Sequence, residues 1–146
     1  MIDSLKYPAL AFVWGMVFPV RSADDATQCT KVALKNGYFS NQLMVDSTGK
    51  AVKIKGAKKL HGVGPFWGYN IFLNQRIRVE LILEGQPFQM DVNEVRGRVL
   101  NSMRGHHGWD ASIDYDELIA SIERTESIYQ ITGIVTDAYY RSYRTN

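Results

Sequence analysis

The residue types best suited to chemistry lie in one short run, His106-His107-Gly108-Trp109-Asp110. With His61 this run offers three imidazoles and a carboxylate, which are ligand types that zinc accepts. Adjacent histidines point in different directions on a helix or a strand, however, and the chain has neither a His-x-x-x-His spacing nor a pair of cysteines. We therefore expect no metal and no cofactor, and a loop between helices in which Trp109 fills the core.

The same run could instead support acid–base catalysis, with His106 or His107 exchanging protons with Asp110. Cys29 is a weaker candidate nucleophile, because it falls on the apolar face of an expected helix, where a buried thiol is inert. A nucleophile, a base and an orienting group cannot be assembled from the sequence. We expect a non-catalytic protein, and a small enzyme or ligand-binding domain with a site near His106, His107 and Trp109 is the alternative.

Glycines and aromatic residues gather between Gly62 and Tyr69. The run lacks the Gly-Lys-Ser/Thr ending of a phosphate-binding loop, and no helix follows it, so the phosphate-binding mechanism has no place to act. Phe66 and Trp67 either fill the core, where large aromatic side chains usually lie, or anchor a partner.

Lysines are concentrated in residues 50–59, as Lys50, Lys53, Lys55, Lys58 and Lys59. Such a patch could contact phosphates, and neighbouring aromatic residues could stack on bases. The net charge of +2 is far below the usual footprint of a nucleic-acid-binding protein, and lysines on an outer strand also protect a sheet edge. Nucleic-acid binding through Lys50 to Lys59 is therefore kept only as an alternative.

The stretch from Asp110 to Glu126 is strongly acidic, with six carboxylates against the single Arg124. It is either a solvated helix face or an acidic surface that docks on a basic protein, where complementary charge raises the association rate. We adopt the second interpretation and expect a protein partner. The expected partner-binding residues are Asp110, Asp114, Asp116, Glu117, Glu123, Trp109, Phe66 and Trp67.

Length and composition limit the remaining possibilities. A chain of 146 residues favours one domain, residues 1–146, and its single cysteine excludes an internal disulfide and suits the cytoplasm. The longest uncharged run, Tyr7 to Val20, is too short to span a bilayer, so we expect no membrane. It could be the core of a cleaved export signal, but Asp3, Pro8 and the lack of a small-x-small cleavage site favour a buried strand.

Strict alternation of apolar and charged residues predicts a strand over residues 76–84, with Ile82 half covered on its polar face, and we build the sheet around it. A continuous apolar run predicts a long strand over 9–20, with a bulge at Gly15. Residues 43–45 and 51–54 flank a glycine-containing turn and predict a hairpin. We expect a loop from Gly56, a strand over 69–73, a tight turn at Asn74-Gln75, and a turn at 85–87 followed by a short strand at 88–90.

Capping patterns predict the helices. Ser22 begins a helix over 23–35, with Ala26, Cys29, Val32 and Ala33 on its apolar face, and Asp91, Asp114 and Ser127 begin three later helices. Gly97 lies inside the first of these three, so we expect close packing on the sheet there. The fold class is α+β: an antiparallel sheet of about five strands, an N-terminal helix inserted after strand 1, and three C-terminal helices, with the helices on one side of the sheet.

A helix ending near Phe39 is followed by Leu43-Met-Val-Asp46-Ser-Thr-Gly49, a wide strand and short capped helices. In size, layout and this Asp-Ser-x-Gly hairpin, about a third of the chain resembles small immunity proteins encoded beside bacterial polymorphic or contact-dependent toxins. These proteins have many unrelated folds, so no site residue carries over. The resemblance implies a cytoplasmic, non-catalytic inhibitor that binds one toxin domain, and an acidic surface would suit a basic nuclease toxin.

Overall fold

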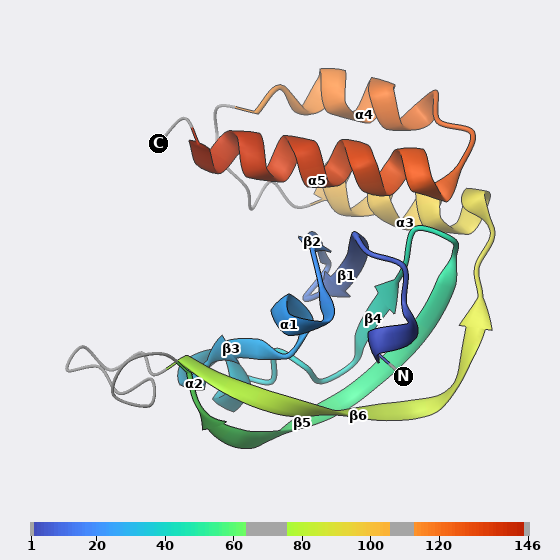
Figure 1. Ribbon diagram of the computed structural model, residues 1–146. Coiled ribbons are helices and arrows are strands. Elements are labelled where there is room, and N and C mark those ends of the chain that lie inside the picture. The colour runs from blue at the N-terminus through green and yellow to red at the C-terminus, as the bar shows by residue number, and fades with distance from the viewer. Residues whose placement is uncertain (1, 64–75, 106–112, 145–146) are drawn as a thin grey trace.

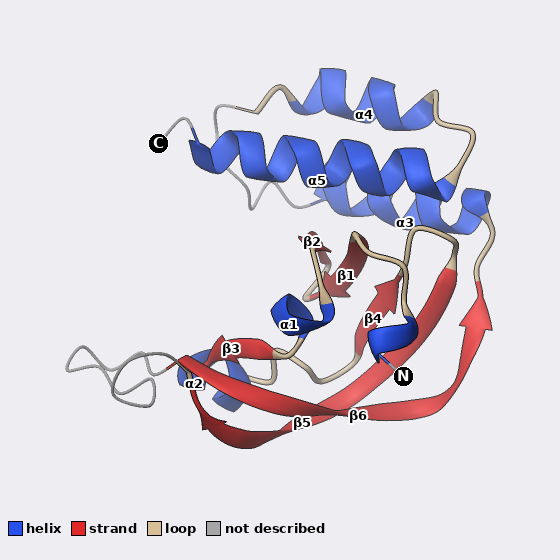
Figure 2. Cartoon of the chain, in the orientation of Figure 1, coloured by secondary structure: helices blue, strands red, loops and turns tan. Residues whose placement is uncertain are grey.

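The computed structural model describes residues 2–63, 76–105 and 113–144 (Figure 1). Within these residues a six-stranded antiparallel sheet has the strand order β2-β1-β4-β5-β6-β3, and three helices form a layer on one of its sides (Figure 2). The fold is α+β, as expected, with six strands rather than about five. The strands are β1 (Ala9–Val13), β2 (Met16–Val20), β3 (Gln28–Thr30), β4 (Gln42–Val45), β5 (Lys50–Gly62) and β6 (Arg76–Gln89).

The helices divide into short N-terminal ones and long C-terminal ones. They are η1 (Ile2–Ser4), α1 (Ala23–Ala26), α2 (Lys31–Lys35), α3 (Val92–Gly105), α4 (Tyr115–Glu123) and α5 (Ile128–Arg144). Several predictions concern residues outside the described ranges. They are those for Phe66, Trp67, the strand over 69–73, the turn at Asn74-Gln75, His106, His107, Trp109 and Asp110.

The expected long strand over 9–20 is wrong, because the chain reverses at its centre. Trp14 and Gly15 both have positive φ, 54° and 76°, and join β1 to β2 as a two-residue hairpin. Pro19 lies within β2 and is tolerated there because β2 is an edge strand. The apolar run is continuous because side chains on both faces of this hairpin are buried, which hides the turn from a reading of periodicity.

The expected helix over 23–35 is also wrong, because a strand interrupts it. Ser22 does cap α1, accepting a hydrogen bond from the Asp25 amide at 3.1 Å, but α1 ends after four residues. Cys29 then lies at the centre of β3, buried, opposite Ile77 of β6. Thr30 caps the separate helix α2, whose Val32 is 45% exposed. Pairing of β3 with a distant strand has overridden local helix propensity.

The strands β4, β5 and β6 form a long curved ribbon (Figure 1). The hairpin between β4 and β5 is confirmed, but β5 continues through Gly56 to Gly62 where a loop was expected. The expected turn at 85–87 is an irregularity within β6, which continues to Gln89: Glu84 pairs with Lys53 and Phe88 with Ala51, so the register shifts across 85–87, where Gly85 has φ +74°. Ile77 and Val79 are buried as predicted, and Ile82 on the other face of β6 is 42% exposed.

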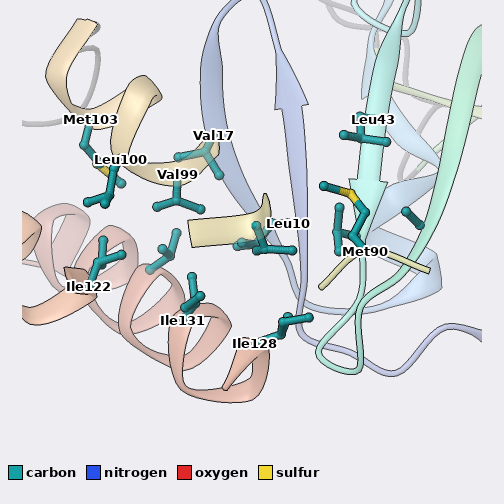
Figure 3. Packing of buried hydrophobic residues seen from close by; sticks show 14 of the residues in the cluster. Leu10, Val17, Leu43, Met90, Val99, Leu100, Met103, Ile122, Ile128 and Ile131 are labelled. Atoms are coloured by element: carbon teal, nitrogen blue, oxygen red, sulfur yellow. The ribbon is translucent and has the colours of Figure 1, made fainter. Parts of the chain in front are cut away.

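The three long helices begin where their capping residues predict. The Asp91, Asp114 and Ser127 side chains accept hydrogen bonds from the amides of Glu94, Glu117 and Gln130, at 2.9, 3.1 and 3.1 Å. Their apolar faces and one face of the sheet share a core, shown in Figure 3. This core includes Leu10, Val17, Leu43, Met90, Val99, Leu100, Met103, Ile122, Ile128 and Ile131.

A second core fills the opposite, concave face of the sheet. Met44 and Val52 are adjacent along their strands to residues of the first core, so this part of the sheet is buried on both faces. η1 and α1 contact each other, and residues from η1 to Phe39 cover the concave face. The expectation that all helices lie on one side of the sheet therefore holds for α3, α4 and α5 only.

The prediction that α3 packs closely on the sheet at Gly97 is wrong. Gly97 is exposed on α3, and a Cβ built there meets no atom within 4 Å, so no close packing on the sheet explains this glycine. Among the described residues, no helix combines the length and apolar character that crossing a bilayer requires.

Candidate binding sites

The acidic residues of α4 lie on the outer side of the helical layer. Leu118 and Ile122 are buried and fix the inner face of α4 in the first core, so the carboxylates project from a rigid support. Those that the structure describes are all exposed: Asp114, Asp116, Glu117, Glu123 and Glu126. These carboxylates lie away from the buried Leu118 and Ile122, and their role in partner binding stays a prediction.

The five carboxylates have different surroundings. Asp114 is the N-cap, and Glu123 is paired with Arg104 of α3 at 2.5 Å, so both hold the helices in place. In the described part of the chain, Asp116 and Glu117 make no ion pair, and their negative charge is stabilised by the positive end of the α4 dipole. These two residues are therefore the carboxylates of α4 that remain available to a basic partner.

The lysines of β5 do not form a uniformly basic face. Lys53 lies opposite Glu84 on β6, and Lys58 lies opposite Glu80, so charge alternates across the two strands. The Lys53 ammonium also lies 5.8 Å from the centre of the Phe88 ring. The glutamates lower the positive electrostatic potential that phosphate binding needs. Charged side chains arranged in this way are typical of a solvated strand surface that is protected from pairing with another chain.

The chemically reactive residues that the structure describes do not gather into a site. His61 is exposed at the end of β5, where its Nδ1 lies 2.8 Å from the carbonyl oxygen of Gly62. Burial raises the pKa of the Cys29 thiol, against the opposing effects of Arg76 and a backbone hydrogen bond at Leu34, and a protonated thiol is a poor nucleophile. In residues 2–63, 76–105 and 113–144 no cluster of three metal-ligating side chains is found.

A cavity of about 310 Å³ lies on the concave side of the sheet. Its walls include Val20 of β2 and Thr30 of β3, the strands at opposite ends of the strand order, so the curl of the sheet brings its two edges to one space. The described residues around it are Ala11, Pro19, Val20, Asp25, Ala26, Gln28, Cys29, Thr30, Ala33, Tyr38, Phe39, Gln42, Met44, Arg76, Tyr139 and Tyr140.

Gln42 is the most deeply buried polar side chain of this cavity, at 3% exposed. It pairs with Ile54 and precedes Met44 by two residues, and both of these belong to the second core, so its side chain projects from the concave face. Among the described residues, no hydrogen-bond partner is found for its amide. In the same residues, every side-chain nitrogen or oxygen atom that is completely buried does have a partner. The amide must therefore be open to the cavity.

Aromatic side chains form part of the lining, together with the charged Asp25 and Arg76. The rings of Tyr38 and Phe39 meet edge to face with centroids 4.9 Å apart, and those of Tyr139 and Tyr140 meet similarly at 5.2 Å. Burial is the main cause that raises the pKa of Tyr38, as it is for Cys29. Both groups are therefore held in their neutral forms, which is the effect of a poorly solvated space.

Reasoning from the sequence did not identify this cavity. Gln42 directly precedes the predicted strand at Leu43, and a single polar residue in that position carries no special signal. The available hint was Thr27-Gln-Cys-Thr30, in which β-branched threonines interrupt helical periodicity and could have indicated a strand. Comparison with known proteins adds no relative: no family model, no curated protein and no solved structure matches the chain.

Proposed function

We propose that this chain is a non-catalytic binding protein of the immunity type, which neutralises a cognate bacterial toxin domain in the cytoplasm through the acidic outer face of α4. The observation that carries the proposal is the pair Asp116 and Glu117, two exposed carboxylates without ion pairs among the described residues, on a helix anchored by buried residues. A basic nuclease domain is the kind of toxin that this surface would attract, because such an enzyme must itself attract phosphates.

A preformed acidic surface acts mainly on the rate of association. Complementary charge steers the encounter between two proteins and disfavours partners of the wrong sign. Because α4 is held by its cap at Asp114 and by the Arg104–Glu123 ion pair, its carboxylates need little reordering on binding. The alternation of lysines and glutamates on β5 and β6 supports a protein partner over nucleic acid.

The proposal predicts that a toxin domain is encoded beside this chain's own gene, and the test uses that domain as the partner. We expect the double variant Asp116→Lys, Glu117→Lys to lower the association rate constant by about tenfold or more at low salt, with a smaller change in the dissociation rate. The effect should fade as salt is added, since surface charges are screened within about 10 Å at 0.1 M salt. Stopped-flow mixing over a series of salt concentrations measures both quantities.

Two further variants serve as controls. Neutralising the same pair, as Asp116→Asn with Glu117→Gln, should give an intermediate association rate, whereas Glu80→Gln with Glu84→Gln on β6 should leave it unchanged. Circular dichroism confirms that each variant is folded. An association rate that is the same for the unaltered chain and the reversed pair would remove α4 as the docking surface.

A further inference from the structure

The cavity on the concave side of the sheet has the size and chemistry of a small-molecule site. Its volume of about 310 Å³ falls at the lower end of the range of roughly 300–1,000 Å³ that ligand pockets occupy. Its walls combine apolar and aromatic side chains with polar groups, among them Asp25, Gln28, Gln42 and Arg76. This site is separate from α4 and does not depend on the function proposed above.

The amide of Gln42 is the feature that points to a ligand. The amide makes no hydrogen bond within the described residues and faces the cavity, so a ligand must replace the hydrogen bonds of water there with a matching donor and acceptor. The amide carries both a donor N–H and an acceptor oxygen on one edge. The complementary partner is a group with an acceptor and a donor side by side, as in a lactam, a primary amide or a carboxylic acid.

The surroundings select among these groups. The aromatic side chains of Tyr38, Phe39, Tyr139 and Tyr140 favour a planar molecule, which can stack on or meet their rings. Asp25 and Arg76 both line the cavity, so its wall carries one charge of each sign and a ligand needs no net charge to balance it. Burial, which raises the pKa of the Cys29 thiol and of the Tyr38 phenol, also disfavours a charged ligand. Arg76 is exposed and also lines the cavity, so the cavity is open to solvent on its side.

We propose that this cavity binds a neutral, planar molecule that carries a lactam or a primary amide, which forms a pair of hydrogen bonds with the Gln42 amide. The ring of the ligand lies among the tyrosines and Phe39, and its polar edge faces β4. The site is formed by the curled sheet, because β2, β3 and β4 all contribute residues to its walls.

The test titrates the full chain with three bicyclic probes of similar size, followed by the backbone amide shifts in ¹⁵N NMR. The probes are 2-quinolone, a neutral lactam; quinoline, which lacks the lactam; and 2-naphthoate, which is an anion. We expect saturable shifts at Ala11, Cys29 and Met44 with 2-quinolone, and dissociation constants at least about tenfold higher for the other two probes.

Variants then localise the effect. Gln42→Leu removes the amide at nearly constant volume and should weaken 2-quinolone binding about tenfold, whereas its affinity for quinoline should change little. Ala33→Leu should weaken all three probes by filling the cavity. Leu43→Met is the matched control, because Leu43 belongs to the same strand but points to the helices, and it should bind like the unaltered chain.

Three outcomes with 2-quinolone would overturn the proposal, and a fourth concerns 2-naphthoate. The three are the absence of saturable shifts with 2-quinolone, equal affinity for 2-quinolone and quinoline, and undiminished 2-quinolone binding by Gln42→Leu. If Gln42→Leu does not fold, the comparison of probes on the unaltered chain still decides between the outcomes. Preferential binding of 2-naphthoate would likewise refute a neutral ligand.

Discussion

Replacement of Asp46 by Asn should destabilise the fold strongly for so small a chemical change. Asp46 is 1% exposed, and its Oδ1 accepts hydrogen bonds from the Thr48 amide at 2.8 Å, the Thr48 hydroxyl at 2.6 Å and the Lys50 amide at 3.0 Å. Its Oδ2 accepts from the Lys6 amide at 2.9 Å. The carboxylate therefore closes the turn between β4 and β5 and ties the segment before β1 to it.

The magnitude follows from the atoms that change. Asn keeps one acceptor oxygen for Thr48 and Lys50, but it places an NH₂ group where Oδ2 accepts from the Lys6 amide. The variant loses a hydrogen bond to a charged group, a contribution of about 1.5–3 kcal/mol, and leaves a buried donor facing another donor. We expect Asp46→Asn to lower the free energy of unfolding by about 2–3 kcal/mol, and Asp46→Ala by more, because it removes all four hydrogen bonds.

The pH dependence gives an independent check. Burial, the largest influence, raises the pKa of Asp46, but the hydrogen bonds from Thr48, Lys6 and Lys50 outweigh it and hold the pKa below its usual 3.8. A carboxyl group whose pKa is lower in the folded chain stabilises the fold fully above its unfolded pKa, and this contribution is lost as the pH falls through the folded value. The stability difference between the unaltered chain and Asp46→Asn should therefore shrink between pH 7 and pH 3.

Urea unfolding followed by circular dichroism measures these differences at both pH values. Asp91→Asn is the matched control, since Asn is as good an N-cap as Asp, and it should change the stability by less than about 0.5 kcal/mol. The reasoning would be refuted if Asp46→Asn were as stable as Asp91→Asn at pH 7. A difference that stays constant down to pH 3 would show that the charge of Asp46 is not responsible.

Two glycine substitutions test the packing in opposite directions by the same urea unfolding. Gly49→Ala should destabilise by about 2–4 kcal/mol, because Gly49 has φ +93° and a Cβ there would lie 2.5 Å from the Met90 carbonyl oxygen and 2.7 Å from the Ile128 Cδ1. Gly97→Ala should stabilise by about 0.5–1 kcal/mol, because Gly97 is an exposed helix position with open space around its Cα. A stabilising Gly49→Ala or a destabilising Gly97→Ala would contradict the packing described here.

The parts of the fold that depend on residues close together in the sequence could be predicted from it. Ser22, Asp91, Asp114 and Ser127 all cap helices where their spacing indicates, because a cap is a hydrogen bond to an amide three residues away. The hairpin closed by Gly49 was predicted for the same reason, since both of its strands lie within a few residues of the turn.

The errors occur where a distant strand decides the local structure. Cys29 is in a strand because β6, almost fifty residues away, pairs with it, and nothing near Cys29 in the sequence records that partner. Trp14 turns the chain with a positive φ although an aromatic residue rarely adopts that conformation. Its ring meets Tyr38 edge to face at 5.6 Å, and Tyr38 comes shortly before β4, which pairs with β1.

The same distinction separates the two candidate sites. The acidic face of α4 could be predicted because helical periodicity places Asp116 and Glu117 away from Leu118 and Ile122. The cavity could not, because its walls come from the two ends of the strand order. α5 contacts both sites: it packs against α4, and its Tyr139 and Tyr140 line the cavity. The helix α5 therefore borders both the acidic face and the cavity, although the two share no residue.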